Sequence, residues 1–155
     1  MKSIKILFVI FTMVFAFNAQ AQKVKIKKGV ATVDKVAYLK VEKINALKYF
    51  ISTLDGTEII SVNIESFGTG KYHTTRNAAT GQRMEITHAY SVLKFLDNEE
   101  IGESFEVDEG RLKHIIKMMY NSNIIVDGQL SIEKIKRMIE KYSENVSERR
   151  FLTKN

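Results

Sequence analysis

The chain has 155 residues with no cysteine, no tryptophan and no proline, and its formal net charge is +6. The lack of cysteine excludes disulfides, a thiol nucleophile and a bacterial lipid anchor, and the lack of proline excludes a proline-rich linker. A net charge of this size is typical of ordinary solubility, so it permits contact with an anionic envelope surface without arguing for it.

Residues 1–21 have the pattern of a secretory signal peptide. Two lysines lie within the first five residues, residues 6–17 are apolar apart from one threonine, and residues 18–21 (NAQA) place small residues where signal peptidase cuts. We therefore expect cleavage after Ala21 and export to the periplasm or the outside of the cell. The apolar run is shorter than the roughly 20 residues of a membrane-spanning helix, so we expect no transmembrane segment.

The first two thirds of the mature chain, about residues 23–107, predict β-strands. Residues 23–27 alternate lysine with apolar residues, as in an edge strand with one solvated face, and residues 37–42 alternate in the same way. Lysines on an edge strand discourage pairing with another molecule. Self-assembly of the protein through the edge strand at residues 23–27 nevertheless remains an alternative function to the binding of another molecule.

A β-hairpin is predicted next. Residues 47–51 and 60–64 each alternate apolar and polar side chains, and Asp55 and Gly56 lie between them. Asp-Gly favours a tight turn whose two central residues both have positive φ.

Residues 67–82 are polar and rich in glycine and threonine, which indicates a long loop or a frayed hairpin. Long loops often carry function, and this one gathers cationic side chains among its glycines. The candidate ligand-binding residues are Lys71, His73, Arg76 and Arg83, which could recognise an anionic group by charge and hydrogen bonding. An ordinary flexible hairpin tip would have the same composition.

Residues 83–96 predict a further strand, in which His88 shares a face with Tyr90. Leu93 and Phe95 fall on the opposite face, so the strand either contains a bulge or is buried on both sides. A turn at residues 97–100 and a last short strand at residues 101–107 follow.

Two amphipathic helices are predicted in the final third, at about residues 109–121 and 131–146. Asp108 and Ser131 are the expected N-cap residues, and Asp127-Gly128 is expected to form a turn between the helices. Together the elements predict one α+β domain over residues 22–155: a mostly antiparallel sheet of about five to six strands, with both helices packed on one face.

The sequence contains no recognisable reactive constellation. It has no His-x-His or Cys pattern for zinc, no complete calcium loop after Asp127 and no Gly-x-Ser-x-Gly nucleophile elbow, so we expect no metal or cofactor. The connector between the helices is about ten residues long, too long for a DNA-binding helix-turn-helix, whose turn has about three or four. We therefore expect no binding of nucleic acid.

Three histidines are present. His88 is expected to be a hydrogen-bonded core residue, His114 to face solvent opposite the apolar stripe of its helix, and His73 to be the best functional candidate. The paired carboxylates Asp108 and Glu109 fall at a helix start, where acidic residues are common for structural reasons.

Residues 18–22 (NAQAQ) and 120–130 (YNSNIIVDGQL) resemble those of small uncharacterised exported proteins of Gram-negative bacteria, of the kind common in the Bacteroidetes. The resemblance covers the leader and the C-terminal third. It implies a periplasmic or extracellular location and brings no activity with it.

These features favour an exported, non-catalytic binding domain of the cell envelope whose partner is an envelope protein or an anionic envelope ligand. The alternative is a hydrolase of an unrecognised type that uses His73 or His88 with a carboxylate. The sequence leaves the oligomeric state open.

Overall fold

A computed structural model describes residues 22–96 and 104–152; the expected signal peptide, the turn at 97–100 and residues 101–103 of the last predicted strand lie outside them. The main element is a seven-stranded antiparallel sheet in which each strand pairs with its neighbours in the chain. Its strands are β1 (Val24–Lys27), β2 (Val30–Val33), β3 (Val36–Lys43), β4 (Lys48–Ser52), β5 (Glu58–Arg76), β6 (Arg83–Phe95) and β7 (Phe105–Val107). The predicted α+β class with a mostly antiparallel sheet is confirmed.

The sheet has seven strands, whereas five to six were expected. The additional strand is β2, which had no clear signal in the sequence. Tight turns flank β2, and both central residues of each have positive φ: Lys28 and Gly29 on one side, Asp34 and Lys35 on the other. Lysine and aspartate adopt this conformation less readily than glycine. At the predicted Asp55-Gly56 turn only Gly56 has positive φ, so that connection is not the expected tight turn.

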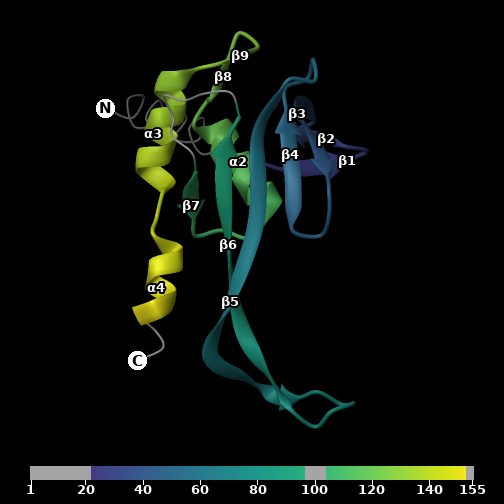
Figure 1. Cartoon of the computed structure of the whole chain (residues 1–155). Helices are drawn as coiled ribbons and strands as arrows, with labels where there is room; N and C mark the ends of the chain where they lie inside the picture. The colour runs from purple at the N-terminus through teal and green to yellow at the C-terminus, as the bar shows by residue number, and fades with distance from the viewer. Residues whose placement is uncertain (1–21, 97–103, 153–155) are drawn as a thin grey trace, which may run out of the picture.

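The hairpin of β5 and β6 extends far beyond the rest of the sheet (Figure 1). β4 pairs with β5 only as far as Asn63, and β7 pairs with β6 only from Ser91 onward. Past those points, β5 and β6 pair only with each other among the strands that the structure describes. We call residues 68–87 the arm, since nearly all of them are exposed. Of the two alternatives for residues 67–82, a long loop or a frayed hairpin, the structure shows a hairpin, with the strands interrupted only between Arg76 and Arg83.

Three helices follow the sheet. α2 (Leu112–Asn121) contacts β1 and β2, whereas α3 (Ile132–Tyr142) and α4 (Val146–Leu152) contact β7. A small hairpin, β8 (Ile125–Val126) and β9 (Gln129–Leu130), joins α2 to α3 through the predicted turn at Asp127 and Gly128. Ser131 occupies the N-cap position of α3, as expected.

Two helix predictions were wrong. Asp108 does not cap α2: the helix begins at Leu112 and Arg111 is its N-cap residue. The helix expected at 131–146 ends at Tyr142, and a separate helix, α4, begins at Val146. The β7 residue Glu106 fixes this break, because its backbone oxygen accepts from the amide of Glu144 and its carboxylate accepts from the amide of Ser147, at 2.9 and 2.8 Å.

The apolar side chains of the sheet and of α2 and α3 form one buried cluster. Fully buried members include Leu39, Ile51, Ile60 and Leu93 from the strands, with Ile115, Ile116, Met119 and Ile135 from the helices. Each such side chain stabilises the fold by about 1.5–3 kcal/mol relative to an exposed position. No helix in the described ranges is long and apolar enough to cross a membrane.

β6 is covered on both sides near the base of the arm. Tyr90 on one face and Leu93 on the other are both buried, and the pairing of β6 with β5 is regular from Phe95 to Thr87. Of the two sequence alternatives for this strand, burial on both sides is confirmed and the bulge is not observed there.

Candidate functional site

The connection between β7 and α2, residues 108–111, brings together charged side chains from β6, α2 and α4. Asp108 and Glu109 are consecutive, but their carboxylates bind different histidines, His88 on β6 and His114 on α2. The side chains of His88 and His114 are 40% and 50% exposed. The prediction of a core position for His88 was therefore wrong, while His114 does reach solvent.

Close packing on β6 holds this connection in place. A Cβ atom on Gly110 would lie 2.5 Å from Cβ of Ala89 and 3.0 Å from its carbonyl carbon, so only glycine fits without displacement. Next to it, the hydroxyl of Ser91 donates to the backbone oxygen of Glu109 at 2.7 Å. This crossing explains why α2 starts later than the sequence predicted: the chain must pass over β6 before it can turn into the helix.

Asp108 connects β6 to the C-terminal helix. One carboxylate oxygen binds Nε2 of His88, and the other accepts from Nη2 of Arg149 at 3.4 Å. Arg149 also pairs with Glu144. A cleft of about 280 Å³ opens beside this group, lined by Phe67, Thr69, Lys71, His88, Asp108, Val146 and Arg149. We call it the arm cleft, because β5 and β6 form one wall at the base of the arm.

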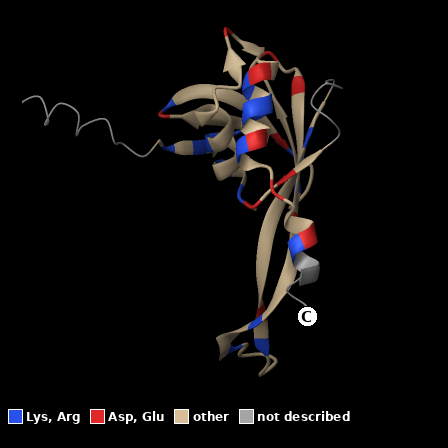
Figure 2. Ribbon diagram, turned by 90° about the vertical axis from the view of Figure 1, so that its left-hand side faces the viewer, with Lys and Arg blue, Asp and Glu red and all other residues tan. Residues whose placement is uncertain are grey.

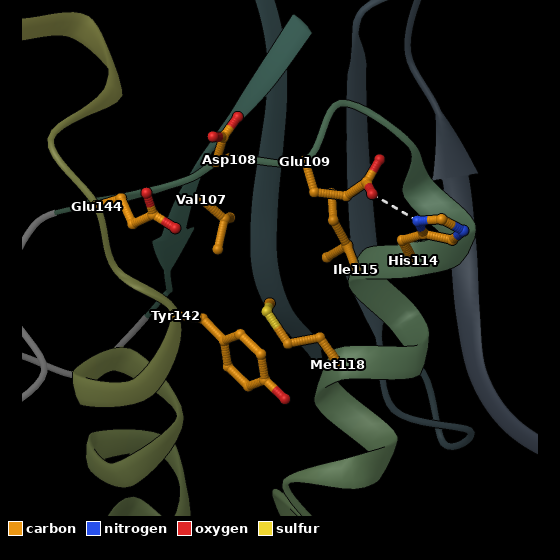
Figure 3. A pocket seen from close by; sticks show the side chains of 8 residues that line it. All are labelled: Val107, Asp108, Glu109, His114, Ile115, Met118, Tyr142 and Glu144. Atoms are coloured by element: carbon orange, nitrogen blue, oxygen red, sulfur yellow. Dashed lines mark hydrogen bonds and ion pairs between the residues drawn. The ribbon is translucent and has the colours of Figure 1, made fainter. Parts of the chain in front are cut away.

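Glu109 is the centre of the second group. Partial burial by itself would raise the pKa of Glu109, but hydrogen bonds from Arg111 and His114, together with the charge of His114, hold that pKa below its ordinary value. Figure 3 shows Glu109 directed at His114, with Met118 and Tyr142 lower in the view. The hollow that these residues help to line has a volume of about 200 Å³. The acidic groups at this hollow, Asp108, Glu109 and Glu144, all have basic partners.

A third and larger space lies between the sheet and the start of α2. It has a volume of about 620 Å³ and is lined by Ile26, Gly29, Val41, Lys43, Tyr49, Ile64 and the first residues of the helix region, Gly110 to His114. We call it the cationic cleft, because its charged lining residues are all basic.

The predicted ligand-binding residues lie on the arm. His73, Arg76 and Arg83 are exposed toward its far end, and Lys71 lines the arm cleft. Figure 2 shows blue, basic segments gathered at the far end of the arm. Arg76 lies directly opposite Arg83 in the strand pairing, so their side chains leave the same face of the hairpin.

A bulge shapes the arm between these cations and the body. The pairing shifts between Gly68 and Tyr72, Gly70 has φ +72°, and the amide of Gly70 donates to a carboxylate oxygen of Glu85 at 2.8 Å. Glu85 is therefore engaged with the backbone, close to where the basic residues begin.

Two features of the described residues bear on metal binding and on catalysis. In those ranges no group of three or more His, Asp or Glu side chains is placed to hold a metal ion. In the arm cleft, Thr69 has the one hydroxyl among the described lining residues, and this hydroxyl donates to the backbone oxygen of Ile86 at 2.7 Å. The His88–Asp108 pair therefore has no free hydroxyl from this lining to activate.

No family model, no curated protein and no solved structure matches this chain. The site must therefore be interpreted from its own geometry.

Sequence reasoning missed the two histidine–carboxylate pairs and the cationic cleft. Glu109 and His114 are five residues apart with a glycine between them, a local spacing that could have suggested the contact. The pairing of His88 with Asp108 depends on the crossing over β6, and no spacing in the sequence indicates it.

Proposed function

We propose that this chain is an exported, non-catalytic binding domain of the bacterial cell envelope, and that the arm binds anionic, phosphate-bearing lipids of that envelope. The observation that carries the proposal is the position of Arg76 directly opposite Arg83 at the far end of the arm. Like charges in this position destabilise a strand pair by a few tenths of a kcal/mol. An anion between the two guanidinium groups would remove that cost.

The surroundings of the two arginines favour a binding surface. Tyr72 and Met84 on the arm are each 56% exposed, so apolar and cationic side chains lie together there. A two-stranded hairpin is only marginally stable in water by itself. An amphipathic surface such as a membrane interface offers both phosphate groups and apolar contact.

The test uses residues 22–155 and two variants that lose the same charge. One variant replaces Lys71, Arg76 and Arg83 with alanine; the matched control replaces Lys25, Lys27 and Lys94, which are exposed lysines of the body. Co-sedimentation with phosphatidylglycerol vesicles should fail for the arm variant and persist for the control. Equal binding of the two variants, or no binding by the natural sequence, would overturn the proposal.

A hydrolase is the second candidate, and one observation favours it: His88 lies in a cleft with its ring held by Asp108. In that reading, His88 would take a proton from a water molecule while Asp108 orients the imidazole and stabilises its charged form. Hydrolysis of p-nitrophenyl acetate by the natural protein and by Asp108→Asn separates the candidates. Equal rates for the two proteins would exclude this function.

A further inference from the structure

The cationic cleft is a built pocket of the body, far along the sheet from the tip of the arm. Its volume of about 620 Å³ falls within the range of about 300–1,000 Å³ that small-molecule sites occupy. The sheet contributes one side and α2 the other. This places the cleft where two layers of the fold meet.

Apolar side chains form the floor of the cleft. They come from four strands and the helix: Ile26, Val41, Tyr49, Ile64 and Leu112. Val41 belongs to the core, while the other four pack against the core and remain partly exposed. Water therefore reaches a continuous apolar surface here, which an apolar ligand group would cover favourably.

Basic side chains form the rim, and the described residues that line the cleft include no aspartate or glutamate. The rim consists of Lys43 on β3, with Arg111, Lys113 and His114 at the start of α2. Arg111 and His114 are already bound to Glu109. Lys43 and Lys113 are exposed and form no ion pair within the described ranges, so they are the groups available to an anion.

We propose that the cationic cleft binds a small amphipathic anion, an acyl-chain carboxylate whose tail lies on the apolar floor and whose head meets Lys43 and Lys113. Charge complementarity selects this occupant. A cationic amphiphile would meet only like charges, and a short anion without a tail would leave the floor uncovered. The inference is independent of the arm and of the lipid binding proposed for it.

Dodecanoate is the probe, and binding is measured by calorimetry with residues 22–155. Dodecanoate should bind, whereas acetate, which has the head without the tail, and dodecylamine, which reverses the charge of the head, should not. The same titration is repeated with Lys113→Glu and with Lys117→Glu, a matched charge reversal one helical turn further along α2 and outside the cleft lining.

Lys113→Glu should weaken dodecanoate binding about tenfold or more, as expected for loss of a hydrogen bond to a charged group. Lys117→Glu should leave binding within about twofold of the natural protein. Lys113 is exposed and Lys117 is partly exposed, so circular dichroism must show that each variant is folded before its binding is compared. Three outcomes would each overturn the proposal. They are equal effects of the two substitutions on dodecanoate binding, binding of dodecylamine as tight as that of dodecanoate, and no binding of dodecanoate by the natural protein.

The arm variant separates this inference from the proposed function. Alanine at Lys71, Arg76 and Arg83 should abolish vesicle binding and leave dodecanoate binding unchanged. Loss of dodecanoate binding in that variant would place the carboxylate on the arm and overturn the assignment to the cleft.

Discussion

Asp108 and Glu109 are adjacent in the chain, yet their carboxylates bind histidines on different elements, His88 of β6 and His114 of α2. Consecutive residues in an extended segment point in opposite directions, so one short connection joins β6 and α4 on one side to the first turn of α2 on the other. The His88–Asp108 pair connects separate elements, whereas the His114–Glu109 pair lies within one short segment. Substitutions in the two pairs should therefore change the stability of the protein in different ways.

Replacing Asp108 with asparagine removes the charge that pairs with both His88 and Arg149. We expect the free energy of unfolding to fall by about 1 kcal/mol, since these partners are partly exposed and partly screened by water. Urea unfolding measures the change. The double variant with Arg149→Gln should lose less than the sum of the single losses; full additivity would show that the Asp108–Arg149 contact contributes nothing.

Glu109 should make the free energy of unfolding decrease at acid pH. Its pKa is held below the ordinary value, so the unfolded chain takes up the proton first as the pH falls. The stabilisation is complete above the ordinary glutamate pKa and is lost as the pH falls through the lower folded-state value. In urea unfolding over a pH series, Glu109→Gln should lose stability less steeply on the acid side than the natural protein does; identical slopes would contradict the assignment.

Gly110→Ala should be the most damaging small substitution in the connection. The added methyl group would overlap Ala89, whose carbonyl carbon is backbone and cannot rotate away. Overpacking of this kind costs about 1–3 kcal/mol. Adding Ala89→Gly removes the Cβ–Cβ overlap and leaves the backbone contact, so the double variant should recover part of the lost stability in thermal unfolding. A double variant that is less stable than Gly110→Ala alone, by the full cost of Ala89→Gly, would show that the crossing is not tightly packed.

Tyr38 offers a stabilising substitution. Its ring packs edge-on against Tyr120 with centroids 5.1 Å apart, and its buried hydroxyl has no hydrogen-bond partner in the described ranges. A hydroxyl buried without a partner is costly, so Tyr38→Phe should leave the free energy of unfolding unchanged or raise it by up to about 1 kcal/mol at neutral pH. A loss beyond about 1 kcal/mol would indicate a partner for the hydroxyl.

Alkaline pH gives a second test of Tyr38. Burial, with a smaller contribution from Tyr120, raises the pKa of Tyr38 above its ordinary value. The unfolded chain therefore loses the proton first, and stability falls as the pH rises above the ordinary tyrosine pKa. Tyr38→Phe should reduce this alkaline loss; an unchanged alkaline slope would contradict burial of the phenol.

Arg83→Glu should separate arm stability from arm function. Glutamate opposite Arg76 replaces repulsion with attraction, which stabilises a cross-strand pair by about 0.2–1 kcal/mol. Hydrogen exchange of arm amides should slow while binding to phosphatidylglycerol vesicles falls. Faster exchange would mean that the two side chains do not interact across the strands.

Alternation of apolar and polar residues was enough to predict most of the sheet, because a strand with one buried face repeats every two residues. It failed at β2, where the central pairs of the two tight turns are Lys28-Gly29 and Asp34-Lys35 rather than the Asn-Gly or Asp-Gly that most strongly marks such a turn. It also could not decide between loop and hairpin for the arm, where neither face is buried and the pattern disappears.

The candidate site was less accessible to sequence reasoning. The arm cations could be proposed as a site from the sequence because they lie close together in the chain. The cationic cleft draws on residues from Ile26 to His114, and the His88–Asp108 pair depends on Gly110 passing over Ala89. Contacts between distant segments have no fixed spacing, so the three-dimensional structure was needed to find them.

The chain order of the strands has a consequence for how the protein folds. Since each strand pairs with the one before it, the sheet can assemble by successive local steps, which favours fast folding. The exception is α2, which returns from the far end of the sheet to pack on β1 and β2. Closing that long loop has a large entropic cost. If α2 docks in the rate-limiting step, substitutions that weaken its contacts with the sheet should slow folding. If α2 docks later, the same substitutions should mainly speed unfolding.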